Sequence, residues 1–96
     1  MTTFLMFGTY TAAAEKKVSS KRTKHANAII KGLKGRVVAE YAMLGKPDLL
    51  LIVELPDVKD VIKASIELSE LTGISFTTEP AVTVAEFDKL FKSIKK

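Results

Sequence analysis

The 96 residues form one domain, residues 1–96, because two domains of half that length would each be too small to bury a stable core. Cysteine is absent, which excludes disulfides and thiolate chemistry and agrees with a reducing cytoplasm, while a single histidine excludes a multi-histidine metal site within one chain. The net charge of +4 is uneven, because residues 1–48 hold nine basic and three acidic residues, whereas residues 49–96 hold six and eight.

The basic excess lies mostly between residues 16 and 36 and has two interpretations, an anionic partner or a solvated helix face. We favour the solvated face, because aromatic residues do not alternate with the charges as they do on single-strand nucleic-acid platforms. No run approaches the roughly 20 continuous apolar residues of a membrane span. Residues 1–10 lack the basic start of a signal peptide, so a cytoplasmic protein without membrane contact is predicted.

The chain begins with a predicted strand over residues 3–10, in which Phe4 and Met6 share one face and Leu5 and Phe7 the other. Gly8 within it indicates a bulge or a close backbone approach. Thr11 is then a candidate N-cap for a short helical turn over residues 12–14.

The first long helix is predicted over residues 20–31, with Ser19 or Ser20 as its N-cap and glycines at 32 and 35 where it stops. Its apolar positions follow helical spacing and predict a narrow stripe facing the core: Ala26, Ile29, Ile30 and Leu33. Its basic residues are expected on the wet side: Lys21, Arg22, Lys24 and Lys31.

Two apolar runs, residues 37–44 and 49–55, are joined by turn residues between Gly45 and Asp48 and predict a hairpin. Both runs are apolar on both sides, so we expect the hairpin in the middle of a sheet. The first strand, residues 36–44, alternates only weakly, and its alternation places Val37, Ala39, Tyr41 and Met43 on one face. Gly45 permits a positive φ and Asp48 can bond back to turn amides, which makes the pair a structural turn motif.

A second helix follows Pro56, with Asp57 as N-cap, Asp60 in the first turn and Gly73 at the end. Its expected buried side consists of Val58, Val61, Ile62, Ser65, Leu68 and Leu71. A strand over residues 74–82 contains Pro80, which argues for an edge strand or a bend. Thr83 and Glu86 then form a capping box that opens a last helix. This helix is expected to bury Val84, Phe87, Leu90, Phe91 and Ile94.

This order of elements predicts an α+β, ferredoxin-like β-α-β-β-α-β plait, a four-stranded antiparallel sheet with two helices on one face plus a C-terminal helix. The opposite face of the sheet carries too much apolar surface to meet water alone. We therefore predict an obligate homodimer packed sheet to sheet. Alternatively, the C-terminal helix could cover this face of its own sheet or extend over the edge of the partner. The sequence does not distinguish these arrangements.

Three pairs of side chains are candidates for a ligand site, each beside a structural alternative. His25 and Arg22 on the first helix could hold an anion, although a surface histidine among lysines is the commoner case. Tyr10 and Tyr41, expected on neighbouring strands, could orient a small ligand or be ordinary core tyrosines. Glu40 and Glu54 could meet across the hairpin and perturb each other, or point to the rim. The spacing provides no metal site and no known phosphate-binding motif.

The run YAMLGKPDLLLIVELPD, residues 41–57, resembles the core of the GYD-domain family. The residues that match the family's pattern are Gly45, Asp48, Glu54, Pro56 and Asp57, and FGTYT and residues 77–87 look like its first and last strands. Pro47 stands where the family has its tyrosine, so no role of that tyrosine is carried over. The resemblance implies a dimeric α/β-barrel, a fold shared with cofactor-free monooxygenases, haem-degrading enzymes and ligand-sensing domains of transcription regulators. It implies no particular activity.

Three hypotheses for function follow. The favoured one is a small homodimeric ligand-binding or accessory module that needs no cofactor and has a pocket for a small metabolite between sheet and helix. The alternative is a cofactor-independent monooxygenase-like enzyme that would use Tyr10, His25, Glu40 and Tyr41. The third, binding of an anionic partner by residues 16–36, requires an affinity that falls with salt. The sequence leaves open whether the protein is an enzyme.

Overall fold

The structure is a computed structural model that describes residues 1–11 and 20–94. Its elements in chain order are β1 (Thr2–Thr9), α2 (Ser20–Gly32), β2 (Arg36–Ala42), β3 (Leu49–Leu55), α3 (Val58–Thr72), β4 (Ser75–Ala81) and α4 (Val84–Ile94). The helical turn predicted at residues 12–14 and the candidate cap Ser19 lie outside the described residues. Within the described part of the chain, every helix is too short or too polar to cross a membrane.

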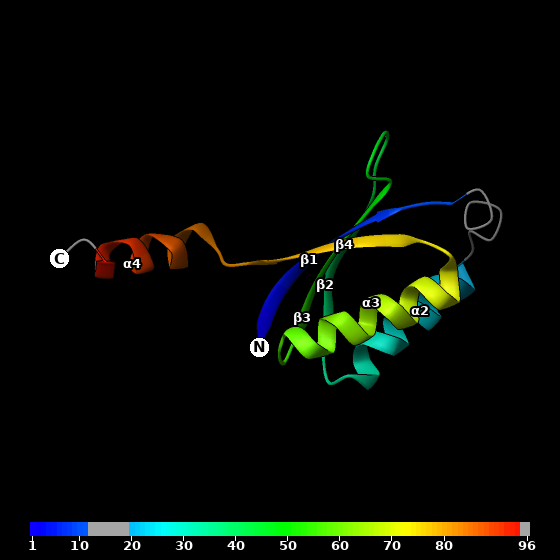
Figure 1. Ribbon diagram of the computed structural model, residues 1–96, viewed down its shortest axis with the longest axis horizontal. Helices are drawn as coiled ribbons and strands as arrows, with labels where there is room; N and C mark the ends of the chain where they lie inside the picture. Colours follow the sequence, from blue (N-terminus) through cyan, green and yellow to red (C-terminus); the bar gives the residue numbers. More distant parts are fainter. Residues whose placement is uncertain (12–19, 95–96) are drawn as a thin grey trace.

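The four strands form one antiparallel sheet in the order β2-β3-β1-β4, and α2 and α3 lie side by side against one of its faces (Figure 1). This arrangement confirms the predicted ferredoxin-like plait with a C-terminal helix. The expectation that the whole hairpin lies in the middle of the sheet is wrong, because only β3 is central and β2 is an edge strand. Pro80 lies on the other edge strand, β4, as a proline without an N–H requires.

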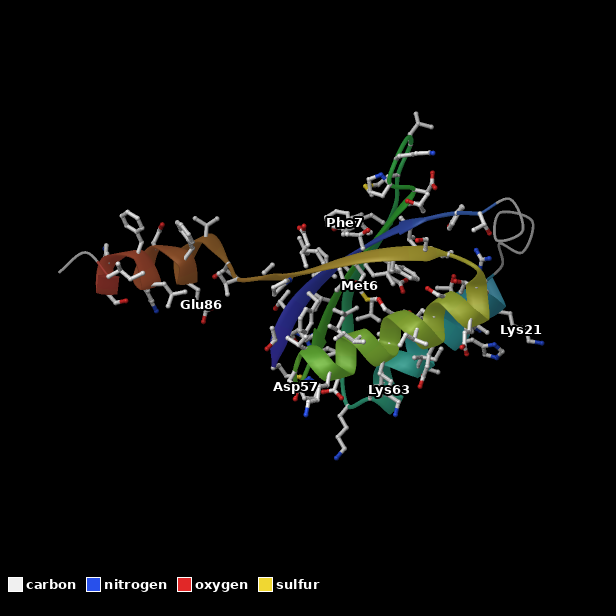
Figure 2. The ribbon with its side chains drawn as sticks, viewed as in Figure 1. Met6, Phe7, Lys21, Asp57, Lys63 and Glu86 are labelled. Carbon is white, nitrogen blue, oxygen red and sulfur yellow. The ribbon has the colours of Figure 1, made fainter. Side chains whose placement is uncertain are left out.

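The core lies between the sheet and the two helices. Phe4 and Met6 of β1 are fully buried, and Figure 2 labels Met6 on the side of the sheet that faces the helices and Phe7 on the other. The predicted stripe of α2 packs against this core, with Ile30 buried and Ala26, Ile29 and Leu33 partly buried. The remaining buried apolar side chains of the core cluster come from β3 and α3: Leu51, Val53, Leu55, Val61, Ala64 and Leu68.

Helix α3 is fixed at both ends as predicted. The Asp57 carboxylate accepts the backbone N–H of Lys59, and the Asp60 carboxylate accepts the N–H of Asp57, which completes a reciprocal capping box. Gly73 ends the helix at φ 74°, in the left-handed region that glycine adopts without strain. Val58, Ile62 and Leu71, however, are exposed rather than buried, because the sheet covers only the narrower face around Val61, Ala64 and Leu68.

A β-bulge in β2 corrects the predicted faces of that strand. Val37 pairs with the helix-facing Val53, yet Ala39 pairs with Ile52 on the opposite face, so the register shifts between residues 37 and 39. The shift exchanges the two faces beyond the bulge. As a result Glu40 shares the helix side of the sheet with Leu51, and Tyr41 lies opposite Leu50 on the other face.

The face of the sheet away from the helices, which we call the open face, is apolar at its centre. Register places Leu5 beside Ile52 and Phe7 beside Leu50, and all four side chains are half-buried by one another. Tyr41 extends this surface onto β2 and is 56% exposed. Arg36 and Glu54 form an ion pair at one end of the open face. Nothing in the described chain packs over this surface.

Helix α4 continues beyond the sheet in the direction of β4 and lies apart from the rest of the molecule (Figure 1). Thr83 caps it, since its hydroxyl accepts the N–H of Glu86. The expectation that α4 buries its apolar residues is wrong for the single chain. All five are exposed, from 50% at Phe91 to 81% at Ile94, because α4 reaches no surface of its own domain.

Candidate functional site

A cavity of about 90 Å³ lies between α2 and the sheet, at the end where β1 stops. Its floor is apolar and is built from β3, α3 and the start of β4: Leu49, Leu51, Leu68, Ile74 and Phe76. Its rim is polar and includes Tyr10, Arg22, Thr23 and Glu40. The site therefore combines an apolar floor with charges of both signs at its mouth, a common design for small-molecule pockets.

Gly8 shapes the floor of the cavity. A Cβ atom at this position would lie 2.9 Å from Cγ2 of Ile74 and 3.1 Å from the ring of Phe76. Both of those residues line the cavity, and it is their side chains rather than another backbone that approach Gly8. The strand register also runs through Gly8 without a shift, so neither the bulge nor the close backbone approach expected there is observed. A side chain there would displace the residues that form the floor.

The rim is held in place by the turn of the β2–β3 hairpin. The Asp48 carboxylate accepts the backbone N–H of Tyr10 at 2.9 Å, and the Asp48 N–H donates to the carbonyl of Gly8 at 2.9 Å. The guanidinium of Arg22 lies over the Tyr10 ring, 5.7 Å from its centre. Asp48 thus fixes the residue against which Arg22 stacks.

The turn itself has the predicted geometry. Gly45 has φ 106°, which only glycine adopts readily, and the Lys46–Pro47 peptide bond is cis. The expected bonds from the Asp48 side chain to turn amides are replaced by the longer-range bond to Tyr10. The turn motif therefore acts on the rim of the cavity as well as on the hairpin.

Three of the five predicted ligand residues, Tyr10, Arg22 and Glu40, line this one cavity. Arg22 is half-buried at the rim rather than on the wet side of α2 with Lys21 and Lys24. His25 is exposed on α2 and does not line the cavity, so the pairing of His25 with Arg22 in one pocket is not observed. Tyr41 lies on the open face.

The other two expected pairings are wrong. Tyr10 and Tyr41 are not on neighbouring strands, because β3 lies between β1 and β2. Glu40 faces the cavity, whereas Glu54 bonds Arg36 on the open face, so the two carboxylates lie on opposite sides of the sheet. No carboxylate dyad forms across the hairpin.

Sequence reasoning missed the contributions of α3 and β4 to this site. Thr72 lines the cavity, but its hydroxyl donates to the Leu68 carbonyl at 2.7 Å and accepts the Ile74 N–H at 3.1 Å. Its role is to join α3 to β4. Among residues 1–11 and 20–94, no group of three or more metal-binding side chains is present. The chemistry that the site offers is recognition, by a guanidinium, a carboxylate and a phenol above an apolar floor.

Comparison with known proteins identifies the family. The family described as GYD domain matches residues 4–91, which confirms the resemblance seen in the sequence. No curated protein matches this chain. Among solved structures, the chain is similar to the crystal structure of the Mycobacterium tuberculosis leucine response regulatory protein LrpA, with a TM-score of 0.56 and 8% identity. The match covers 85% of this chain and 51% of that one, and at this identity it shows the fold alone.

Proposed function

This chain belongs to the GYD domain family, and on that basis we propose that it is a small homodimeric module that binds a small metabolite in the cavity between α2 and the sheet. The observation that carries the proposal is the gathering of Tyr10, Arg22 and Glu40 from three distant segments at the mouth of one apolar cavity. A purely structural helix–sheet interface would be filled by apolar side chains instead.

The charges at the rim define the chemistry of the ligand. Arg22 provides a fork of donors for a carboxylate, and Glu40 provides an acceptor for an ammonium group or a hydroxyl. The floor, which includes Leu51, Leu68 and Phe76, accommodates a short aliphatic chain. A small amino acid with an aliphatic side chain meets all three requirements. Leucine is a suitable first probe, since the fold also occurs in a protein named for its response to leucine.

Three probes of nearly equal shape test this assignment by thermal shift. Leucine has both charged groups, 4-methylpentanoate has only the carboxylate, and 3-methylbutylamine has only the ammonium. We expect leucine to raise the melting temperature most, by roughly 10 °C or more at 100 times its dissociation constant, where linkage adds about 2.7 kcal/mol. Arg22→Gln should remove the difference between leucine and the amine. Lys24→Gln, a nearby exposed residue of α2 with the same loss of charge, is the control.

The ligand proposal fails if none of the three probes shifts the melting temperature. It also fails if Arg22→Gln and Lys24→Gln respond alike to every probe, because the rim charge would then have no part in binding.

The dimer part of the proposal rests on the open face. Leu5, Phe7, Leu50 and Ile52 form a continuous apolar surface that α2 and α3 do not cover. Packing of two such sheets face to face by a two-fold axis would bury it. Ile52→Lys places a charge at its centre and should raise the dissociation constant of the dimer, measured by sedimentation equilibrium. Leu44→Lys, in the fully exposed hairpin turn, is the control and should leave the dimer intact. Wild-type protein that sediments as a monomer contradicts the proposal.

The oxygenase alternative gains no support from the site. Of its candidate residues, His25 is exposed on α2 and Tyr41 lies on the open face, so neither lines the cavity that holds Tyr10 and Glu40. Lys21, Lys24 and Lys31 on α2 are exposed, which agrees with a solvated face and with an anionic partner alike, so the interpretation of the charge stays a prediction. The cytoplasmic location stays a prediction.

A further inference from the structure

A second apolar depression lies on the outer side of α3. It is a groove of about 370 Å³ between this helix and the edge strand β4, separate from the ligand cavity. Val58, Ile62 and Ile66 form a stripe along its α3 side, and Phe76, Thr78 and Pro80 lie on its β4 side. The three aliphatic side chains of the stripe are each more than half exposed, although they lie beside the core. We call this the α3–β4 groove.

Helix α4 carries the matching surface. Val84, Phe87, Leu90, Phe91 and Ile94 follow helical spacing and form one apolar side, which no part of its own domain covers. The rings of Phe87 and Phe91 stack with centroids 6.2 Å apart, so they form one continuous aromatic ridge. An amphipathic helix with such a ridge is the usual occupant of an apolar groove.

We propose that α4 of one copy of this chain docks into the α3–β4 groove of a second copy, and that α4 of the second copy docks into the same groove of the first. This arm exchange adds an interface to the homodimer proposed above and uses surfaces that the open-face contact does not. It rests on that proposal only in taking a second copy as the partner.

The connection between β4 and α4 favours a second copy over the chain's own groove. Only Val82 and Thr83 separate the two elements, and the side chain of Thr83 is hydrogen-bonded as the N-cap of α4. To reach its own groove, α4 would have to reverse direction beside β4 within these two residues. Figure 1 shows that it instead continues outward along β4. A short hinge followed by a helix whose apolar side is exposed is the arrangement that favours exchange between copies.

Charge complementarity sets the direction of docking. Along α4 the charged residues run from acidic to basic: Glu86 and Asp88, then Lys89 and Lys92. Along α3 the exposed charges run the other way, with Lys59 and Lys63 before Glu70, since Asp57 and Asp60 are engaged in the capping box. Figure 2 labels Lys63 on α3 and Glu86 on α4. Opposite charges meet when α4 lies parallel to α3.

The area is also sufficient. From their exposed fractions, the five apolar side chains of one α4 offer on the order of 500 Å² to a partner, given the size of aromatic and aliphatic side chains. Two arms and two grooves would then bury on the order of 2,000 Å², which lies in the range of stable protein–protein interfaces.

The absence of cysteine makes disulfide crosslinking a clean test. Ile66→Cys and Ile94→Cys are made in separate chains, mixed and oxidised, and the products are separated without reductant. Parallel docking brings these two positions together, so we expect a crosslinked dimer of two different variants. Val58→Cys mixed with Ile94→Cys is the matched control. Residue 58 lies two turns, about 12 Å, from residue 66, and the yield should fall at least fivefold.

Two results would overturn the proposal. If the double variant Ile66→Cys/Ile94→Cys links only within one chain and the mixture gives no dimer, α4 occupies its own groove. If neither sample links, α4 does not occupy the groove at all. The same mixture in an Ile52→Lys background separates this proposal from the open-face dimer. We expect the crosslink to persist in that background, because the arm exchange uses other surfaces. A protein that is an Ile52-dependent dimer, but whose mixture of cysteine variants never crosslinks between chains, removes the arm exchange and leaves the open-face dimer.

Discussion

The bond between Asp48 and Tyr10 gives the sharpest prediction, because it joins the hairpin turn to the rim of the cavity between α2 and the sheet. Its geometry is good, with 2.9 Å between the Tyr10 nitrogen and the carboxylate, in a half-buried position. Hydrogen bonds to charged groups contribute about 1.5–3 kcal/mol, and the partial exposure of this one places it near the lower limit. We expect Asp48→Ala to lower the free energy of unfolding by about 1.5 kcal/mol.

That loss corresponds to a fall in melting temperature of roughly 6–12 °C for a domain of this size. Asp48→Asn keeps an acceptor oxygen without its charge and should lose about half as much. Both variants should also weaken binding of leucine, because Tyr10 and the Arg22 guanidinium stacked on it lose their anchor. Thermal unfolding at one fixed protein concentration measures the first effect, since association would otherwise alter the melting temperature.

Glu70→Gln is the control, since it removes one negative charge from an exposed residue of α3 that does not line the cavity. It should stay within about 0.5 kcal/mol of wild type, as surface substitutions usually do. The reasoning is refuted if the destabilisation caused by Asp48→Ala is no larger than that caused by Glu70→Gln. Equal leucine affinity in the two variants would show separately that the turn does not position the rim.

Three further predictions concern the scaffold. Asp57→Ala should cost about 1 kcal/mol by removing the α3 cap, and Asp57→Asn only a few tenths, in urea unfolding; equal losses would contradict the capping role. Leu68→Ala should cost about 2–5 kcal/mol, because Leu68 is fully buried and the cavity it leaves adds to the lost transfer energy. A loss below 1 kcal/mol would place Leu68 outside the core. Arg36→Ala should change stability by less than about 1 kcal/mol, because its pair with Glu54 is largely exposed; a larger effect that persists at high salt would contradict this.

The sequence predicted the fold well because each local signal agreed with the others. The Asp57 cap, the left-handed Gly73 and the proline on β4 all lie where their backbone preferences require. It failed in β2, where one extra residue between Val37 and Ala39 exchanges the faces of the strand. A bulge cannot be recognised in a strand whose apolar and polar residues alternate this weakly. Glu40 could therefore not be assigned to the cavity side from the sequence.

The candidate site shows what kind of information the sequence lacks. Each of the three expected pairs contributed one member to the cavity, namely Arg22, Tyr10 and Glu40, and none of the pairs stayed together. The candidate residues were identified by the chemistry of their side chains, which can be read directly from the sequence. Which side chains meet depends on strand order and register, and these are set by long-range pairing. The position of β3 between β1 and β2 separated the tyrosines, and the bulge separated the glutamates.

The two edges of the sheet are unfavourable for pairing with another chain, which leaves the faces and helices for the proposed association. Pro80 removes an N–H from the outer edge of β4, and the bulge at Val38 bends β2, so both edges resist pairing with a strand from another chain. The remaining apolar surfaces are the open face, the α3–β4 groove and α4. The first is self-complementary under a two-fold axis, and the other two complement each other. In the two contacts proposed above a second copy would cover all three, whereas an unrelated partner would have to match each of them separately.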